Sequence, residues 1–216
     1  MKTTTSKEKV LKNIRNALIN KSMSSYSVND SETPIYNYSE EPLDIAFVQQ
    51  FTNIGGKFVY CEDISDFALQ FKELLKKNTN WVNIFCLDDN IREIFRKSNI
   101  PFSDEESDFM ATNVGVTTCE FLIARLGSVM VSSKLDSGRR LIVFPDVHIV
   151  VAYSSQIVPD IKNALSGIKE KYGKYIPSTI SMITGPSRTA DIEKTLVLGA
   201  HGPKEIYVFL IDDSEY

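Results

Sequence analysis

Apolar strand-like runs alternate with helical patterns from residue 43 to the end of the chain, and this alternation constrains the fold more than any other feature. The runs are short and nearly continuous in apolar residues, whereas the segments between them repeat apolar residues every three or four positions. Strands that are apolar on both faces are typical of a parallel sheet covered by helices on both sides. The sequence therefore predicts an α/β fold with a mostly parallel sheet.

The predicted helices span residues 43–54, 65–78, 90–98, 114–127, 157–173 and 187–199. The predicted strands span residues 57–62, 81–87, 128–133, 140–145, 148–154, 179–185 and 205–212. Three of these strands follow one another closely between residues 128 and 154. Such short links favour a local antiparallel portion, because a parallel pair needs a long crossover connection.

A short amphipathic helix is predicted ahead of this domain, over residues 6–21. It places Val10, Ile14 and Leu18 on one face, and Ser6 can cap its start. Residues 22–42 are polar, contain two prolines and show no period, which is typical of a linker. We therefore expect an N-terminal helix and linker over residues 1–42 and one domain over residues 43–216. The helix could dock on its own domain, on a second copy or on another partner.

The charge and hydropathy of the chain argue against two classes of partner, nucleic acids and membranes. The net charge is −4 and the isoelectric point is near 5.3, which argues against a nucleic-acid-binding surface. No apolar run approaches the ~20 residues that span a bilayer, and the N-terminus lacks a signal-peptide core. We expect a cytoplasmic protein with no membrane partner. The sequence leaves the oligomeric state open, with a homo-oligomer as one alternative.

The cysteines and histidines do not form a metal-binding pattern. Cys61, Cys86 and Cys119 are far apart, and the histidines, His148 and His201, are separated by 52 residues. Iron–sulfur clusters typically need four thiolates, and zinc sites need closely spaced ligands. We expect no metal site and no intrinsic cofactor. Cys61, Cys86 and His148 lie within apolar runs and are interpreted as core residues.

Two breaks interrupt the apolar pattern near the C-terminus and mark the candidate ligand site. The first contains Gly185, Pro186 and Ser187, and the second runs from Gly199 to Pro203 around His201. The first break is interpreted as a strand end, a tight turn and a helix start, capped by Ser187 or Thr189. The start of a helix binds anions through its free N–H groups, although capping alone would explain the same residues.

The predicted ligand-binding residues of these breaks are Thr184, Gly185, Ser187, Arg188, Thr189, Asp191 and Gly202. Ligands of parallel sheets gather outside the carboxyl ends of the strands. We therefore expect Ser187, Thr189 and His201 to converge on one pocket there and to bind a small anion. His201 is the first candidate for a catalytic residue, with a purely structural loop histidine as the alternative.

Three further residues are candidates. Glu120 falls in the predicted helix over residues 114–127 and could place a carboxylate at the mouth of the sheet, or simply lie in a capped first turn. It is the second candidate catalytic residue. Arg139 and Arg140 follow Gly138 in a predicted turn and could offset the charge of an anionic ligand, although turn arginines are usually solvated.

Taken together, the C-terminal motifs resemble a known family. They read G-P-S-x-T-x-D-I-E over residues 185–193 and G-x-H-G-P over residues 199–203, with P-x-x-H at Pro145 and His148. This pattern resembles the LUD domain of the lactate-utilisation protein C family, from about residue 44 to residue 213. The resemblance implies a fold similar to ribose-5-phosphate isomerase, glucosamine-6-phosphate deaminase and the CoA transferases (NagB/RpiA/CoA-transferase-like).

The resemblance also implies a function. Family members are similar to proteins needed to oxidise L-lactate to pyruvate alongside two iron–sulfur proteins. The chain would then be a non-redox component that binds a small anionic ligand, those iron–sulfur partners, or both. The alternative is a stand-alone enzyme acting on a phosphosugar, folate-like or CoA-linked substrate, and turnover by the chain itself is left open. Relatives tend to carry an acidic residue where this chain has Arg125, which would change the preferred charge of the ligand.

Overall fold

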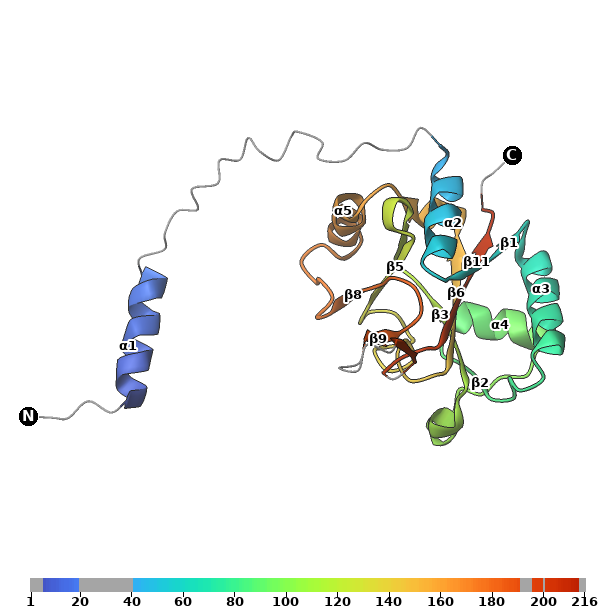
Figure 1. Cartoon of the computed structure of the whole chain (residues 1–216), viewed down its shortest axis with the longest axis horizontal. Helices are drawn as coiled ribbons and strands as arrows, with labels where there is room; N and C mark the ends of the chain where they lie inside the picture. Colours follow the sequence, from blue (N-terminus) through green and yellow to red (C-terminus); the bar gives the residue numbers. More distant parts are fainter. Residues whose placement is uncertain (1–5, 20–40, 191–195, 200, 214–216) are drawn as a thin grey trace, which may run out of the picture. The chain divides into compact units, whose positions relative to one another are not determined.

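The computed structural model of the chain describes residues 6–19, 41–190, 196–199 and 201–213. The chain divides into two compact units, residues 1–37 and residues 38–216. The described part of the first unit is the helix α1 (Ser6–Ile19), and every other described element belongs to the second (Figure 1). None of the described helices is long and apolar enough to cross a membrane.

The second unit is built on a five-stranded parallel sheet. Its strands are β1 (Lys57–Cys61), β2 (Ile84–Cys86), β3 (Val114–Thr118), β6 (Val147–Tyr153) and β11 (Glu205–Ile211). They lie in the order β1-β11-β6-β3-β2, and every neighbouring pair is parallel. The predicted α/β fold with a mostly parallel sheet is confirmed.

A second, mostly antiparallel sheet lies beside the first. It contains β4 (Phe121–Ile123), β5 (Ser128–Ser132), β7 (Ile157–Val158) and β8 (Ile180–Ile183), in the order β7-β4-β5-β8. β5 is antiparallel to both β4 and β8, whereas β4 and β7 are parallel. A separate antiparallel hairpin is formed by β9 (Arg188–Ala190) and β10 (Leu196–Leu198).

The helices of the second unit are α2 (Leu43–Asn53), α3 (Ile64–Lys77), α4 (Asp89–Lys97) and α5 (Ile161–Tyr172), with 3-10 turns η2 (Glu106–Ala111), η3 (Ala124–Leu126) and η4 (Ser154–Gln156). α3 and α4 cover one face of the central sheet (Figure 1). The other face is covered by α2 and the second sheet. α5 packs on the outer face of that second sheet.

Strand β6 contributes to both cores because its side chains alternate between the two faces. Ile149 and Val151 point toward α3 and α4, whereas Val150 and Ala152 point toward α2 and the second sheet. All of these residues are almost completely buried. A strand that is apolar on both faces is what a sheet covered on both sides requires.

Aspartates set the starts of three helices. The carboxylates of Asp63, Asp88 and Asp160 accept hydrogen bonds from backbone N–H groups in the first turns of α3, α4 and α5. The helix predicted over residues 157–173 therefore starts later than expected. Its first residues, Ile157 and Val158, instead pair with β4 as strand β7.

The prediction of a helix over residues 114–127 is wrong. This segment forms strands β3 and β4 and the 3-10 turn η3. Three of the five residues of β3, Val114, Val116 and Thr117, are β-branched and completely buried between neighbouring strands. A Cβ at Gly115 would lie 2.6 Å from Cγ of Pro145, so the strand also needs this glycine.

The prediction of a strand over residues 140–145 is also wrong. The N–H groups of Val143 and Phe144 both donate to the carbonyl of Arg140, which closes a helix-like turn. Leu141 is buried, in a cluster with Phe85 and Phe109, while Val143 and Phe144 remain about half exposed. The apolar run therefore packs through Leu141 and, partly, Ile142 instead of extending as a strand.

Gly127, directly after η3, lies in tight contact with the backbone of α2. It adopts a left-handed conformation, with φ +59°, and a Cβ placed on it would lie 2.3 Å from the backbone nitrogen of Phe51. Backbone atoms within a helix cannot move aside cheaply. The packing of this turn against α2 therefore requires a residue without a side chain at position 127.

We predict that Gly127→Ala destabilises the domain by more than 3 kcal/mol, because backbone strain of about 1–2 kcal/mol adds to a steric clash. Gly138→Ala is the matched control, since Gly138 has φ +60° but a Cβ added to it would meet no atom within 4 Å. The control variant should be destabilised only by the backbone strain of about 1–2 kcal/mol. Urea unfolding of both variants measures the difference, and equal losses would contradict the packing role of Gly127.

Candidate functional site

The two C-terminal breaks are joined by a hairpin, not by a helix. The predicted helix over residues 187–199 is wrong, because β9 and β10 pair antiparallel with Arg188 opposite Leu198. The N–H of Gly199 donates to the carbonyl of Ser187 at 3.0 Å, and the N–H of Ser187 donates to the carbonyl of Pro203 at 2.8 Å. The first break therefore lies directly against the second.

Glycine makes this contact possible. A Cβ on Gly202 would lie 3.2 Å from Cβ and 3.3 Å from Oγ of Ser187. Gly185 and Gly199 both have positive φ angles, +79° and +74°, which turn the chain into and out of the hairpin. His201 directly precedes this contact and is exposed to solvent.

The first break also packs on the end of α2. The guanidinium of Arg188 donates to the carbonyl of Ile54 at 2.5 Å, where the helix leaves free carbonyl groups. Thr184 shares a 2.9 Å hydrogen bond with the hydroxyl of Ser128 at the start of β5. Asp191 lies outside the described residues, as does the side chain of Thr189.

The location of these residues differs from the prediction. His201, Gly202 and Pro203 precede β11, whose first residue, Glu205, pairs with the first residue of β6. They therefore lie at the amino end of the central parallel sheet. The expectation that the site lies at the carboxyl ends of its strands is wrong, and the absence of a helix start removes the predicted dipole-based anion site.

Arg139 and Arg140 are held by other partners. Arg139 donates to Oγ of Ser178 at 2.6 Å, before β8 begins, whereas Thr184 follows the end of β8. Thr184 lies six positions after Ser178 along extended chain, or roughly 20 Å away at ~3.3 Å per position. Arg140 pairs with Glu106 at 2.7 Å and lies over the ring of Phe109. The structure therefore does not bring either arginine to the hairpin.

Glu120 forms a buried ionic cluster under α5. Its carboxylate accepts from Ser132 at 2.5 Å, from Tyr172 at 2.7 Å and from Lys171 at 2.8 Å. Burial alone would raise the pKa of Glu120, but these hydrogen bonds and the charge of Lys171 hold the pKa below its ordinary value. The arrangement therefore stabilises a carboxylate and anchors α5 to the second sheet.

Arg125 is also paired within the protein. Its guanidinium donates to Asp160 at 2.8 Å, next to the start of α5. The positive charge of Arg125 is therefore offset by a carboxylate. The expected change in the preferred charge of a ligand does not follow from this position alone.

His148 is buried in the core, as its position in an apolar run predicted. It lies on β6, facing the second sheet, and its Nε2 is 2.8 Å from Oγ1 of Thr117. Nδ1 has no hydrogen-bond partner among the described residues. Complete burial lowers the pKa of His148 to about 4, so the ring is neutral at pH 7. The P-x-x-H motif was the available signal.

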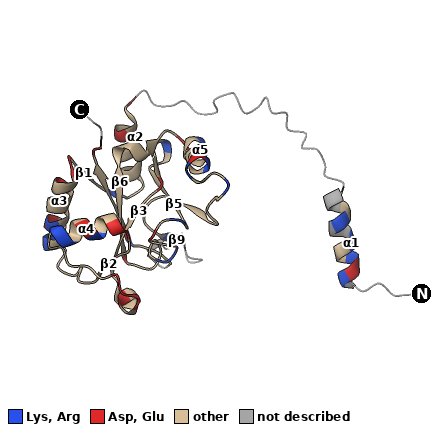
Figure 2. Ribbon diagram, turned by 180° about the vertical axis from the view of Figure 1, so that it is seen from behind, with Lys and Arg blue, Asp and Glu red and all other residues tan. Residues whose placement is uncertain are grey.

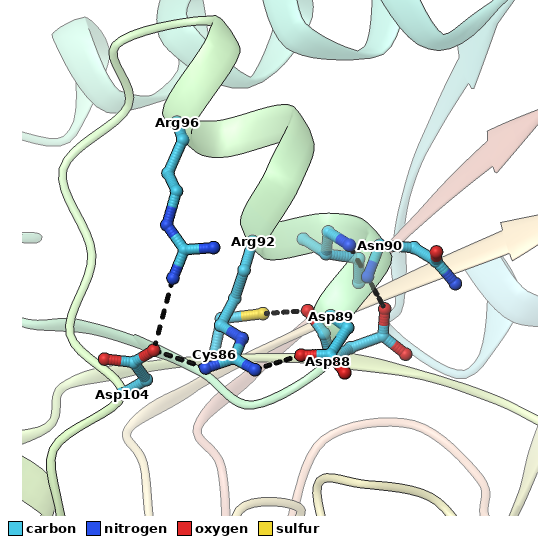
Figure 3. Close-up of polar contacts among 8 residues, drawn as sticks. Cys86, Asp88, Asp89, Asn90, Arg92, Arg96 and Asp104 are labelled. Atoms are coloured by element: carbon cyan, nitrogen blue, oxygen red, sulfur yellow. Dashed lines mark hydrogen bonds and ion pairs between the residues drawn. The ribbon is translucent and has the colours of Figure 1, made fainter.

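The carboxyl edge of the central sheet is acidic. Asp88 follows β2 and caps α4 (Figure 3). Its carboxylate also accepts a hydrogen bond from Thr118 at 3.2 Å. Asp212 and Asp213 follow β11 and accept from the hydroxyl of Ser154 at 3.1 and 2.8 Å. Aspartates after strands β2 and β11 were the sequence signal for this cluster. An anionic ligand is disfavoured at such an edge.

Arginines offset part of this charge beside α4. Figure 3 shows Arg92 between Asp89 and Asp104, and it forms ion pairs with both. Arg96 also reaches Asp104, at 3.5 Å. These ion pairs tie the loop after α4 to the helix. Among the described residues, grooves of about 290, 380 and 400 Å³ are found, and none of these is lined by a predicted site residue.

Comparison with known proteins identifies the family. The model of the LUD domain matches residues 45–211. The chain belongs to the LUD domain family. A crystal structure of a DUF162 family protein from Deinococcus radiodurans has the same fold, with a TM-score of 0.57 at 16% identity, covering 78% of this chain and 96% of that one.

Two relatives carry the name Lactate utilization protein C. The protein from Bacillus licheniformis is 41% identical and that from Bacillus subtilis is 40% identical, each over 103 residues. Both matches cover 47% of this chain and 43% of the relative. The chain is thus matched over less than half the length of these LUD-family relatives.

We predict that Glu120→Gln lowers the free energy of unfolding by about 2–4 kcal/mol at pH 7, because a buried carboxylate with three donors loses its charge. Glu170→Gln, at an exposed position of α5, should change it by less than about 0.5 kcal/mol. Denaturant unfolding compares the two. A Glu120→Gln protein as stable as the control would show that the cluster contributes nothing.

We predict that His148 makes the domain less stable in acid. Its folded pKa of about 4 lies below the ordinary 6.5, so the unfolded chain binds the proton first as the pH falls. The stabilisation is present above pH 6.5 and is lost toward pH 4, by roughly 3 kcal/mol at ~1.4 kcal/mol per pKa unit.

Unfolding free energies of the wild type, His148→Gln and His201→Gln at several pH values measure this effect. His148→Gln should flatten the profile between pH 6.5 and 4, whereas His201→Gln, at an exposed position, should keep the wild-type slope. Parallel profiles for all three proteins would rule out a buried neutral His148.

Proposed function

We propose that this protein is a non-redox component of an L-lactate utilisation system, which oxidises lactate to pyruvate in the cytoplasm. The observation that carries the proposal is the sequence identity of about 40%, over 103 residues, to two Bacillus proteins named Lactate utilization protein C. In this proposal the chain binds a small anionic ligand at the hairpin, and iron–sulfur proteins of the same system perform the redox chemistry.

The positions of the cysteines support a non-redox role. Cys61 and Cys86 lie on β1 and β2, the two edges of the central sheet. Four inter-strand spacings separate these strands, about 19 Å at ~4.8 Å each. Burial raises the pKa of each of these thiols to about 12, which keeps them protonated. Such thiols are poor ligands for a cluster, since metals bind thiolates.

The contacts at the base of the hairpin support an anionic ligand there. Oγ of Ser187 has no hydrogen-bond partner among the described residues, and its residue is only partly buried. Arg188 donates to a backbone carbonyl, so no carboxylate offsets its charge in that contact. The first break supplies the hydroxyl of Ser187 and the guanidinium of Arg188. The second break, which is hydrogen-bonded to it, supplies the exposed His201. Their chemistry suits a carboxylate or phosphate.

We predict that the chain restores growth on L-lactate to a Bacillus subtilis strain that lacks its Lactate utilization protein C. Ser187→Ala and His201→Ala should reduce this growth, because each removes a polar group from the proposed site. Ser65→Ala, an exposed serine on α3, should grow like the wild type. Immunoblots control for protein level.

If growth is not restored, binding measurements show whether the ligand site is wrong or the chain is merely incompatible with the host. A thermal-shift screen of purified protein with L-lactate, pyruvate, phosphosugars and CoA esters should find a ligand. Ser187→Ala should then lose about 1.5–3 kcal/mol of affinity, the contribution of a hydrogen bond to a charged group. Turnover of a phosphosugar or CoA ester by the isolated chain would instead favour a stand-alone enzyme.

A further inference from the structure

The first 21 residues differ in charge from the remainder of the chain. They contain five lysines, one arginine and one glutamate, a net charge of +5, whereas the whole chain carries −4. The remaining 195 residues therefore carry a net charge of −9. Figure 2 shows the basic residues along α1. Such asymmetry within one chain indicates a separate interaction segment.

Helix α1 is amphipathic as well as basic. At 100° per residue, positions 10, 14 and 18 of the helix fall on one side, with position 11 beside them. Positions 9 and 12, both lysines, fall on the other side, whereas Arg15 falls next to Leu11. Glu8 falls in the same arc as these cations, and Lys7 falls on the apolar side. The side chains of Val10 and Leu11 are 57% and 45% exposed. The helix thus combines an aliphatic stripe with a net positive charge.

Helix α1 is not part of the LUD domain. The family model begins at residue 45, and residues 1–37 form a compact unit of their own. We propose that α1 docks the protein on an anionic lipid surface. The helix lies in the plane of the interface, with its aliphatic stripe at the acyl boundary and its lysines among the acidic headgroups.

The composition of α1 favours lipid over other anionic partners. Binding of nucleic acid would use the cations but not the aliphatic stripe. Protein grooves usually hold large aromatic anchors, and α1 contains no aromatic residue. Lysines with long, flexible stems suit a fluid surface that offers no fixed geometry. The expectation of no membrane partner rested on the lack of a spanning segment, which a surface helix does not need.

Sedimentation with lipid vesicles tests the proposal with the full-length protein. At low salt, the protein should co-sediment with vesicles of phosphatidylcholine and phosphatidylglycerol at a ratio of 7:3, but not with phosphatidylcholine alone. Each cation near an anionic surface strengthens binding by about fivefold. The triple variant Lys9→Gln, Lys12→Gln, Arg15→Gln should therefore bind about 100-fold more weakly, and 0.5 M salt should release the wild type.

Two further variants make the test specific. The triple variant Lys162→Gln, Lys169→Gln, Lys174→Gln changes the net charge equally at exposed positions of the domain, and it should bind like the wild type. Val10→Ser with Leu11→Ser keeps the charge but should weaken binding at least tenfold, because the stripe is interrupted. No binding to anionic vesicles, equal losses in both triple variants, or full binding by the serine variant would each overturn the proposal.

Discussion

The parallel pairing of β6 with β3 on one side and β11 on the other is the constraint on which the structure depends. Seven consecutive residues of β6 pair with β11, and five of them also pair with β3. Because side chains alternate, this register assigns Ile149 to the α3–α4 core and Val150 to the core beneath α2. The same alternation places His148 in the layer between the sheets, where its ring cannot reach water. Burial of this histidine is thus a consequence of register, and its low pKa follows from burial.

The strands of the central sheet could largely be predicted, because apolar runs such as residues 205–212 must be buried on both faces. The two misassigned helices fail for a shared reason. Residues 114–127 and 187–199 are short, contain β-branched residues and show only weak helical periodicity. Whether such a segment becomes a strand depends on partners far away in the sequence, such as β6 for Val116, and no local pattern carries that information.

The sequence indicated that the two C-terminal breaks belong together, but not where they lie in the fold. Two glycine-rich breaks do lie together, yet the connection is a backbone hydrogen bond from Ser187 to Pro203 and not the two ends of a helix. Which edge of the sheet they occupy depends on the direction of β11, and a loop that precedes a parallel strand lies at its amino end. Glu120 and Arg125 were both singled out for their charge. Each is neutralised by a residue that follows later in the chain, Lys171 and Asp160 respectively.

The two ends of the central sheet differ in the charged groups that they present. Asp88, Asp212 and Asp213 lie at the carboxyl ends of the central strands, where each accepts a hydrogen bond from a hydroxyl. Where parallel sheets commonly hold ligands, this protein therefore repels anions. At the opposite end, Lys204 is paired with Asp146, but Arg188 is bound only to the carbonyl of Ile54 among its described contacts. Among the described residues, a carboxylate approaching the domain thus meets aspartates at one edge and, at the other, a guanidinium bound to a backbone carbonyl beside the hydroxyl of Ser187. For an anionic ligand, electrostatics favours the hairpin over the usual edge of the fold.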